Sequence, residues 1–191
     1  MNICVYAASS GKIPQQFVDA AEILGRLLAV RGHTLVNGAG RTGLMGAVTE
    51  GCLSVGGRAV GVIPQFMVDN DWHHSGMSEL VITPDMHTRK EKMAEMADAC
   101  MALPGGVGTL EELLEIITWK QLGLFLKPIV IVNVDGYFNN LLKQLERAVT
   151  EQFMRPMHTG LWQVAQDAEE AVNLAETTPF WDPSLTKFAA I

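Results

Sequence analysis

Three glycines, a threonine and two glutamates stand together in one stretch of this 191-residue chain, residues 103–112. Glycines leave main-chain N–H groups open to an anion, and a helix that begins there directs the positive end of its dipole to the same point. The pattern predicts a phosphate-binding loop. Glu111 and Glu112 add negative charge beside it, so either a cation compensates these carboxylates or one of them acts on the ligand.

The same stretch also has a purely structural interpretation. Thr109 followed by Glu112 forms a capping box, in which a hydroxyl and a carboxylate satisfy free backbone donors at a helix start. A cap does not need three glycines within four positions, so the combination favours a ligand-binding loop. The two interpretations are compatible, because one carboxylate can leave its capping partner when a ligand arrives.

Arg89 and Lys90 stand at the start of another predicted helix, where cations oppose the helix dipole, typically by about 0.3–1 kcal/mol each. Local helix stability does not explain them, whereas an anion or the Glu112 carboxylate does. Thr88 and Glu91 around them form a second possible capping box. The alternative is that both cations are solvated. That interpretation fits Lys90 better than Arg89, because an arginine fork holds a carboxylate or phosphate through two hydrogen bonds.

Two further loops of small residues follow strand-like segments. Residues 38–46 contain the spacing G-x-G-x-x-G of dinucleotide-binding loops, but they follow the second predicted strand, and no Asp or Glu ends the next strand to hold a ribose. Residues 8–11 form the third loop. We interpret both as walls of the same cleft as residues 103–112, where a flat ligand or a phosphate lies. The 38–46 loop is the sole basis for a rival hypothesis, an NAD-dependent oxidoreductase.

The patterns of metal and nucleophile chemistry are missing from the sequence. The adjacent pair His73 and His74 lacks the i, i+4 separation of two metal ligands on one helical face, and no serine stands in a nucleophile-elbow sequence. The sequence therefore implies no metal and no cofactor. Four methionines at helical spacing could cover an aromatic base, although such residues more often form ordinary core. They are Met86, Met93, Met96 and Met101.

Strand-like and helix-like segments alternate along the chain and must position these loops. Short apolar runs predict strands over residues 3–7, 34–37, 59–63, 99–103 and 129–134. Apolar residues at helical spacing predict helices over residues 14–31, 43–55, 89–97, 110–122, 138–153 and 167–176. The alternation predicts an α/β fold with a mostly parallel, doubly wound sheet and helices on both faces. We expect one domain over residues 1–191, because the chain is too short to argue for two.

The predicted sheet places the three loops at one edge. In open parallel sheets, ligands bind beyond the carboxyl ends of strands, near the point where the strand order reverses. All three loops follow strands, so we expect them at that edge. Residues 64–83 interrupt the alternation as one long irregular insert, which we interpret as a lid or a subunit contact.

Charge and composition argue against several classes of partner. The formal net charge is −7, and the chain has no basic stripe of the kind that nucleic acid or an anionic membrane requires. No apolar run approaches the length of a membrane span, and we expect no leader segment before the first strand-like run. Cys4, Cys52 and Cys100 lie in apolar segments without the spacing of a metal or redox pair. We expect a cytoplasmic protein with buried free thiols.

Several motifs resemble the LOG family, the cytokinin riboside 5′-monophosphate phosphoribohydrolases. They are PGGVGTLEE at 104–112, MHTRK at 86–90 and GLMG at 43–46, with ITWKQLG at 117–123 and NVDGY at 133–137. The resemblance runs from the first strand to about residue 153. It implies a Rossmann-like homodimer that cleaves the N-glycosidic bond of adenosine-type nucleoside 5′-monophosphates. The products would be the free base and ribose 5-phosphate.

The resemblance also implies roles for individual residues. Arg89 and Glu112 would be catalytic, and an oxocarbenium-like transition state needs negative charge near the anomeric carbon, a task that fits Glu112. The implied substrate-binding residues are Asp71, Lys90, Gly105, Gly106, Val107, Gly108, Thr109, Leu110, Glu111 and Thr118.

The chain departs from the usual family pattern at three places. Val107 stands where the family usually has Tyr, Gly38-Ala39-Gly40 stands in place of three glycines, and Asp71 stands in place of Glu. These departures bear on substrate preference, so AMP and its N6-isopentenyl derivative both stay open as substrates. The alternative function is a non-catalytic carrier of the same fold, for a phosphate compound, a nucleotide or the molybdenum cofactor. A carrier would release no base.

Overall fold

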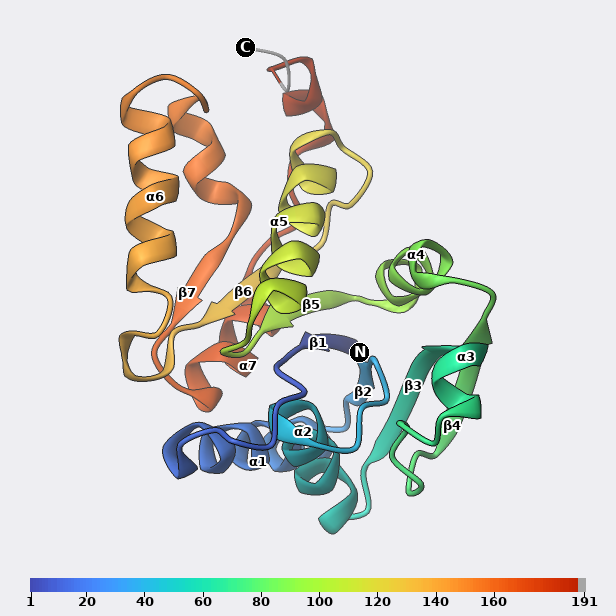
Figure 1. Cartoon of the computed structure of the whole chain (residues 1–191). Coiled ribbons are helices and arrows are strands. Elements are labelled where there is room, and N and C mark those ends of the chain that lie inside the picture. Colours follow the sequence, from blue (N-terminus) through green and yellow to red (C-terminus); the bar gives the residue numbers. More distant parts are fainter. Residues whose placement is uncertain (189–191) are drawn as a thin grey trace.

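Seven parallel strands form one sheet in the computed structural model, which describes residues 1–188 (Figure 1). The strands are β1 (Asn2–Tyr6), β2 (Thr34–Asn37), β3 (Arg58–Pro64), β4 (Glu79–Thr83), β5 (Ala99–Ala102), β6 (Ile129–Val132) and β7 (Gln163–Ala165). Their order in the sheet is β4-β3-β2-β1-β5-β6-β7, and every neighbouring pair is parallel. The sheet confirms the predicted doubly wound α/β fold.

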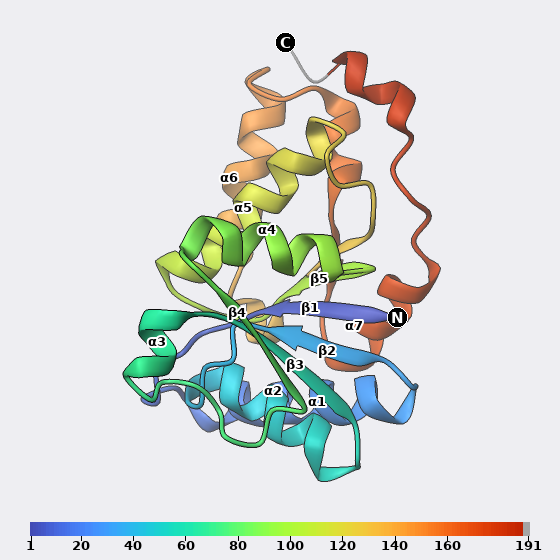
Figure 2. The same cartoon turned by 90° about the vertical axis from the view of Figure 1, so that its right-hand side faces the viewer.

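Helices cover both faces of this sheet. The α-helices are α1 (Gln15–Val30), α2 (Gly43–Ser54), α3 (Gln65–Asp69), α4 (Met86–Met96), α5 (Val107–Gln121), α6 (Asn139–Thr150) and α7 (Ala168–Thr177). The short 3₁₀ helices are η1 (Val134–Gly136), η2 (Pro156–Leu161) and η3 (Pro183–Phe188). Figures 1 and 2 show α1, α2 and α7 on one face of the sheet and α4, α5 and α6 on the other. Across residues 1–188, no helix has the length and hydrophobicity to cross a lipid bilayer.

Side chains of the buried strands alternate between two cores, one beneath each layer of helices. In β1, Ile3 and Val5 belong to the core under α1 and α2, whereas Cys4 and Tyr6 belong to the core under α4 and α5. Both faces carry apolar residues because both faces of a parallel sheet are covered. The three cysteines are buried and free, as the sequence predicts.

The strand order reverses between β1 and β5. The chain winds from β1 through β2 and β3 to β4 in one direction, and from β5 through β6 to β7 in the other. Loops that leave such a switch point diverge and leave room for a ligand. The two loops here begin side by side, because the Leu103 N–H donates to the Tyr6 carbonyl (2.9 Å) and the Ala8 N–H donates to the Pro104 carbonyl (3.3 Å).

The prediction of an irregular insert over residues 64–83 is wrong. The insert begins with α3 and ends with β4, an edge strand that pairs with β3. Glu79 and Ile82 of β4 are exposed, so the strand lacks the continuous apolar run that marks a fully buried strand. Strand β7 is not predicted from the sequence either, because it is only three residues long.

Candidate functional site

A cleft of about 330 Å³ opens at the carboxyl edge of the sheet, beside the switch point. Its walls come from the loops after β1, β2 and β5 and from α2, α3, α4 and α5. The lining residues are Ala7, Ala8, Ser9, Ser10, Gly38, Gly40, Met45, Met67, Met86, Arg89, Gly106, Gly108, Thr109, Glu111 and Glu112. The prediction that three loops of small residues wall one cleft is confirmed.

The start of α5 presents free backbone donors to this cleft. Gly106 is the N-cap residue, and among the described residues no side chain caps the helix. The capping box predicted for Thr109 and Glu112 is wrong, because the helix begins at Val107 and Thr109 lies within its first turn. Uncapped N–H groups at the positive end of a helix dipole are suited to an anion such as a phosphate.

The glycine loop before α5 is held by close contacts. A Cβ atom on Gly105 would lie 2.1 Å from the hydroxyl oxygen of Thr109, so only glycine fits without a shift of the loop. The Tyr137 hydroxyl donates a hydrogen bond to the Gly105 carbonyl (2.9 Å) from the other side. The loop is therefore preorganised, and Thr109 is kept at the lining of the cleft.

Arg89 enters the cleft from α4. Asp85 caps this helix by accepting a hydrogen bond from the Thr88 N–H (2.8 Å), so α4 begins at Met86 and the capping box predicted for Thr88 and Glu91 is wrong. The earlier start places Arg89 one turn inside the helix. Its side chain is 6% exposed, which confirms the prediction that Arg89 is the anchored cation of the pair.

A buried arginine and a buried glutamate face each other at the cleft. The Arg89 Nε donates to the Val62 carbonyl (3.0 Å), and its Nη1 lies 3.8 Å from Glu112 Oε1. Glu112 is 9% exposed. Burial raises the pKa of Glu112 to about 7, while Arg89 lowers it and Glu111 raises it further. A carboxyl group with such a pKa can accept or donate a proton near neutral pH.

Gly38 provides the space that Arg89 occupies. A Cβ atom at position 38 would lie 1.6 Å from Arg89 Nη2. The next residue, Ala39, has φ of +61°, a conformation that glycine adopts more easily than alanine. The usual three glycines of the LOG pattern fit this backbone, and Ala39 is tolerated in it.

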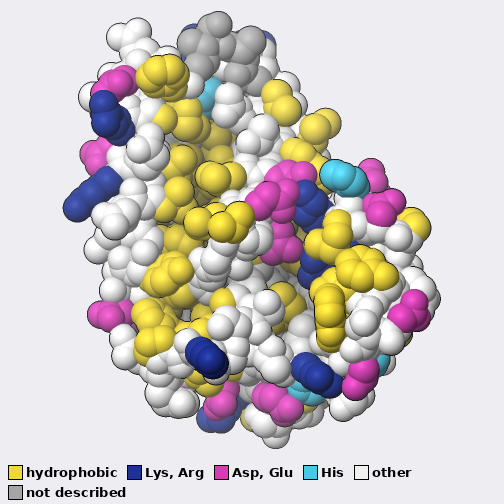
Figure 3. Space-filling model, viewed as in Figure 1, with side chains coloured by type: hydrophobic (Ala, Val, Ile, Leu, Met, Phe, Trp, Pro, Cys, Tyr) yellow, Lys and Arg dark blue, Asp and Glu magenta, His cyan; other side chains and the backbone are white. Residues whose placement is uncertain are grey.

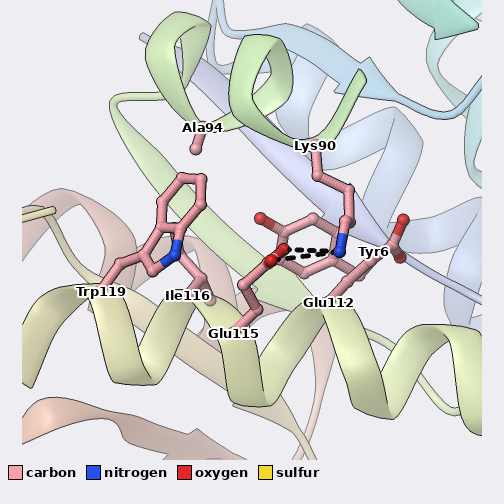
Figure 4. A pocket seen from close by; sticks show the side chains of 7 residues that line it. All are labelled: Tyr6, Lys90, Ala94, Glu112, Glu115, Ile116 and Trp119. Carbon is pink, nitrogen blue, oxygen red and sulfur yellow. Dashed lines mark hydrogen bonds and ion pairs between the residues drawn. The ribbon is translucent and has the colours of Figure 1, made fainter. Parts of the chain in front are cut away.

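Lys90 lies in a narrow gap between α4 and α5, behind Glu112, and not in the cleft itself (Figure 4). Its ammonium group forms ion pairs with Glu111 and, at 3.1 Å, with Glu115. Burial lowers the pKa of Lys90, but the hydrogen bonds to both glutamates outweigh burial and leave that pKa above its ordinary value. The interpretation of Lys90 as a solvated surface residue is therefore wrong.

The structure brings some of the predicted site residues together and leaves others apart. Arg89, Glu112, Gly106, Gly108, Thr109 and Glu111 line one cleft. Asp71 is 80% exposed, pairs with Arg41 (3.1 Å) and lies outside the cleft lining. Thr118 lies about 13 Å farther along α5 than Thr109, and its hydroxyl donates to the Leu114 carbonyl. Gly105 lines a neighbouring pocket, Val107 is 85% exposed and Leu110 packs against the core.

Sequence reasoning missed several residues of the site. Met45 and Met67 line the cleft along with Met86, for which covering a base was one of two interpretations. The role of Met67 could not be predicted from the sequence, because the pattern there predicts irregular chain and not the helix α3. Glu115 could have been found, since it stands one helical turn after Glu111 and Glu112 and so shares their side of α5.

Comparisons with known proteins identify the family of the chain. The model of a family described as "Possible lysine decarboxylase" matches residues 45–175. Cytokinin riboside 5′-monophosphate phosphoribohydrolase LOG7 of Arabidopsis thaliana is 43% identical over 186 residues, which are 97% of this chain and 86% of that protein. The probable phosphoribohydrolase LOGL3 of Oryza sativa subsp. japonica is 42% identical and covers 94% of this chain. The chain belongs to this LOG family.

Solved structures share the fold of this LOG-family chain more widely. The molybdenum cofactor carrier protein of Chlamydomonas reinhardtii superposes with a TM-score of 0.70 at 22% identity, over 92% of this chain and 94% of that one. The protein TM1055 gives a TM-score of 0.71 at 26% identity, over 92% and 98% of the two chains. At such low identity, the likeness to the carrier shows the fold alone.

Proposed function

We propose that this LOG-family protein is an N-glycosyl hydrolase, a nucleoside 5′-monophosphate phosphoribohydrolase. It cleaves adenosine-type nucleotides into the free base and ribose 5-phosphate. The observation that carries this proposal is the buried pair of Arg89 and Glu112 in a cleft that also holds the uncapped start of α5. The names of relatives more than 40% identical over most of the chain support it.

The reaction breaks the bond between the anomeric carbon and the base nitrogen, and water supplies the oxygen that takes its place. Positive charge develops on the sugar ring as the base leaves with the bonding electrons. In the proposed mechanism, ionised Glu112 contacts the ribose hydroxyls, stabilises this charge and helps to activate the water. The base nitrogen gains one proton, and the attacking water loses one.

Arg89 and the glycine loop position the reacting groups. Arg89 holds Glu112 from the opposite side of the cleft, and the backbone donors of Gly106 to Thr109 bind the 5′-phosphate. Phosphate binding remote from the bond that breaks would orient the sugar and hold it against Glu112. Lys90, Glu111, Asp71 and Thr118 stay proposed contacts of the nucleotide.

The proposed substrates are AMP and its N6-substituted derivatives, so the activity includes that of an AMP nucleosidase. The methionines Met45, Met67 and Met86 give the cleft a flexible, polarisable wall. Methionine side chains adapt to different apolar shapes, and this property fits a base with or without an alkyl group.

We also propose that the protein is a homodimer and works in the cytoplasm. Exposed apolar side chains on α5 and at its C-cap support the dimer: Val107 is 85% exposed, Leu114 39% and the C-cap residue Leu122 47%. Figure 3 shows hydrophobic side chains running over α5 toward α6 on this face. The buried free cysteines are compatible with a reducing compartment.

The decisive experiment is incubation of the purified protein with AMP, isopentenyladenosine monophosphate and other nucleotides. Chromatography would detect the free base and ribose 5-phosphate, and we expect both in equal amounts. Release of no base from any nucleotide would overturn the proposal and favour the carrier. Tight nucleotide binding without turnover would support the same conclusion.

Glu112→Gln is the matched variant, because it keeps the size of the side chain and removes its charge. We expect turnover to fall by about 10²–10⁴-fold, the usual contribution of a positioned acid or base, with nucleotide binding largely kept. Near wild-type release of adenine by this variant would refute the role assigned to Glu112.

A further inference from the structure

Lys90 and Glu115 tie α4 to α5 across the gap behind Glu112 (Figure 4). The Lys90 ammonium lies 3.1 Å from the Glu115 carboxylate, and the Lys90 side chain is only 11% exposed, so solvent screens this ion pair weakly. Ala94 from α4 and Trp119 from α5 line the same gap.

The two acidic partners of Lys90 have different surroundings. Glu111 is 52% exposed and lines the cleft, so a bound nucleotide can draw its carboxylate away from Lys90. Glu115 is 30% exposed, lines the gap and is not part of the cleft lining. It is therefore the partner that can keep Lys90 in place while a substrate is bound.

We propose that Glu115 is a positioning residue, which holds Lys90 and thereby keeps Arg89 opposite Glu112. Arg89 and Lys90 are neighbours near the start of α4, so a displacement of the backbone at Lys90 also displaces Arg89. Glu112 stands between the two acidic partners of Lys90 on α5, so this ion pair lies beside the catalytic carboxyl. The catalytic consequence of the inference rests on the proposed function, whereas the contact itself does not.

Charged and titratable groups face Glu112 from three elements. They are Arg89 and Lys90 on α4, Glu111 and Glu115 on α5, and Tyr6 and Cys4 on β1. The negative charge of Glu115 raises the pKa of Glu112, and the positive charge of Lys90 lowers it. Replacing Glu115 by Gln removes this negative charge, while Glu111 still pairs with Lys90. The loss of the charge lowers the pKa of Glu112.

Glu115→Gln and Glu115→Asp, with Glu151→Gln as the control, test the inference. Glu151 forms an exposed pair with Arg147 on α6, so the control makes the same charge change far from the cleft. For Glu115→Gln we expect kcat at pH 8 to fall about tenfold with KM changed less than twofold, since a small displacement of catalytic groups impairs turnover. The acidic limb of its activity profile should move to lower pH. Glu115→Asp should recover most of the turnover, and the control should match the wild type.

A second readout needs no substrate. NMR titration of carboxyl carbons in protein labelled with ¹³C-glutamate should show a lower pKa for Glu112 in Glu115→Gln than in the wild type. Wild-type kcat and an unshifted Glu112 titration in this variant would overturn the inference. A loss of turnover that merely follows a lower melting temperature, and that Glu115→Asp does not recover, would also overturn it. If the wild type cleaves no nucleotide, the proposed function fails, and the titration still decides whether Glu115 acts on Glu112.

Discussion

Glu112 has conflicting surroundings. Burial favours its neutral form, Arg89 at 3.8 Å favours the ionised form, and the balance places its pKa near 7. The proposed mechanism uses the ionised form, which is present above this pKa and disappears as the pH falls through it. The activity of the enzyme should therefore fall on the acidic side of neutrality.

We predict that kcat/KM for AMP, measured between pH 5 and 9, has an acidic limb with its midpoint near 7. Below that midpoint the rate should fall about tenfold per pH unit, because only the ionised fraction reacts. A midpoint near 6 would instead report the second ionisation of the substrate phosphate, which titrates at about 6. A flat profile down to pH 5 would contradict the role of ionised Glu112.

At the scale of secondary-structure elements, the loop after β2 packs closely against α4 and thereby fixes the position of Arg89. Gly38 approaches Arg89 so closely that no side chain fits between them, and the Arg89 Nε donates a hydrogen bond to the Val62 carbonyl near the end of β3. The guanidinium therefore has little freedom to retreat. Gly38 offers no functional group, but it leaves the space that the Arg89 guanidinium occupies.

We predict that Gly38→Ala lowers kcat for AMP at least tenfold while the protein stays folded, because the new methyl group displaces the Arg89 guanidinium from Glu112. Gly11→Ala is the control, since a Cβ atom on Gly11 meets nothing within 4 Å and Gly11 lies outside the cleft lining. Steady-state kinetics and circular dichroism would check both variants. Unchanged kcat in Gly38→Ala would mean that the exact place of Arg89 does not matter.

Features with a local cause could be predicted from the sequence. The buried strands and the glycine loops follow from residue type and spacing alone, and the bidentate chemistry of arginine pointed correctly to Arg89 as the buried cation. The starts of α4 and α5 were predicted three residues too late, because Asp85 and Gly106 are their N-cap residues and not Thr88 and Thr109, which match the capping-box pattern.

Features that depend on long-range contact could not be predicted. The approach of Gly38 to Arg89 and the pairing of Lys90 with Glu115 join residues far apart in the chain, and no local pattern encodes their distance. Lys120 is a similar case. Its side chain in α5 is only 2% exposed, although a charged lysine side chain is normally predicted to be at the surface. Burial lowers the pKa of Lys120 to about 8.

At the scale of the whole molecule, one face of α5 has no cover within the described residues. Val107 and Leu114 on this face, and Leu122 at the C-cap, recur at helical spacing and are exposed, whereas the opposite side of the helix packs into the core. Thr118 shares this face and lies outside the cleft of its own chain. Its proposed contact with a nucleotide therefore needs the cleft of a second copy. The exposed face of α5 and the position of Thr118 thus both support the proposed homodimer.

We predict a mass in solution of twice the 20.8 kDa of the chain, measured by light scattering coupled to size exclusion. Leu114→Glu should shift this mass toward 20.8 kDa, because a charge in an apolar contact must be desolvated without a partner. Val30→Glu is the control, since Val30 is 73% exposed at the end of α1, in the layer on the other side of the sheet. A wild-type mass of 20.8 kDa would refute the homodimer. A dimer that survives Leu114→Glu and is lost in Val30→Glu would place the contact on α1 and leave Thr118 without a route to the nucleotide.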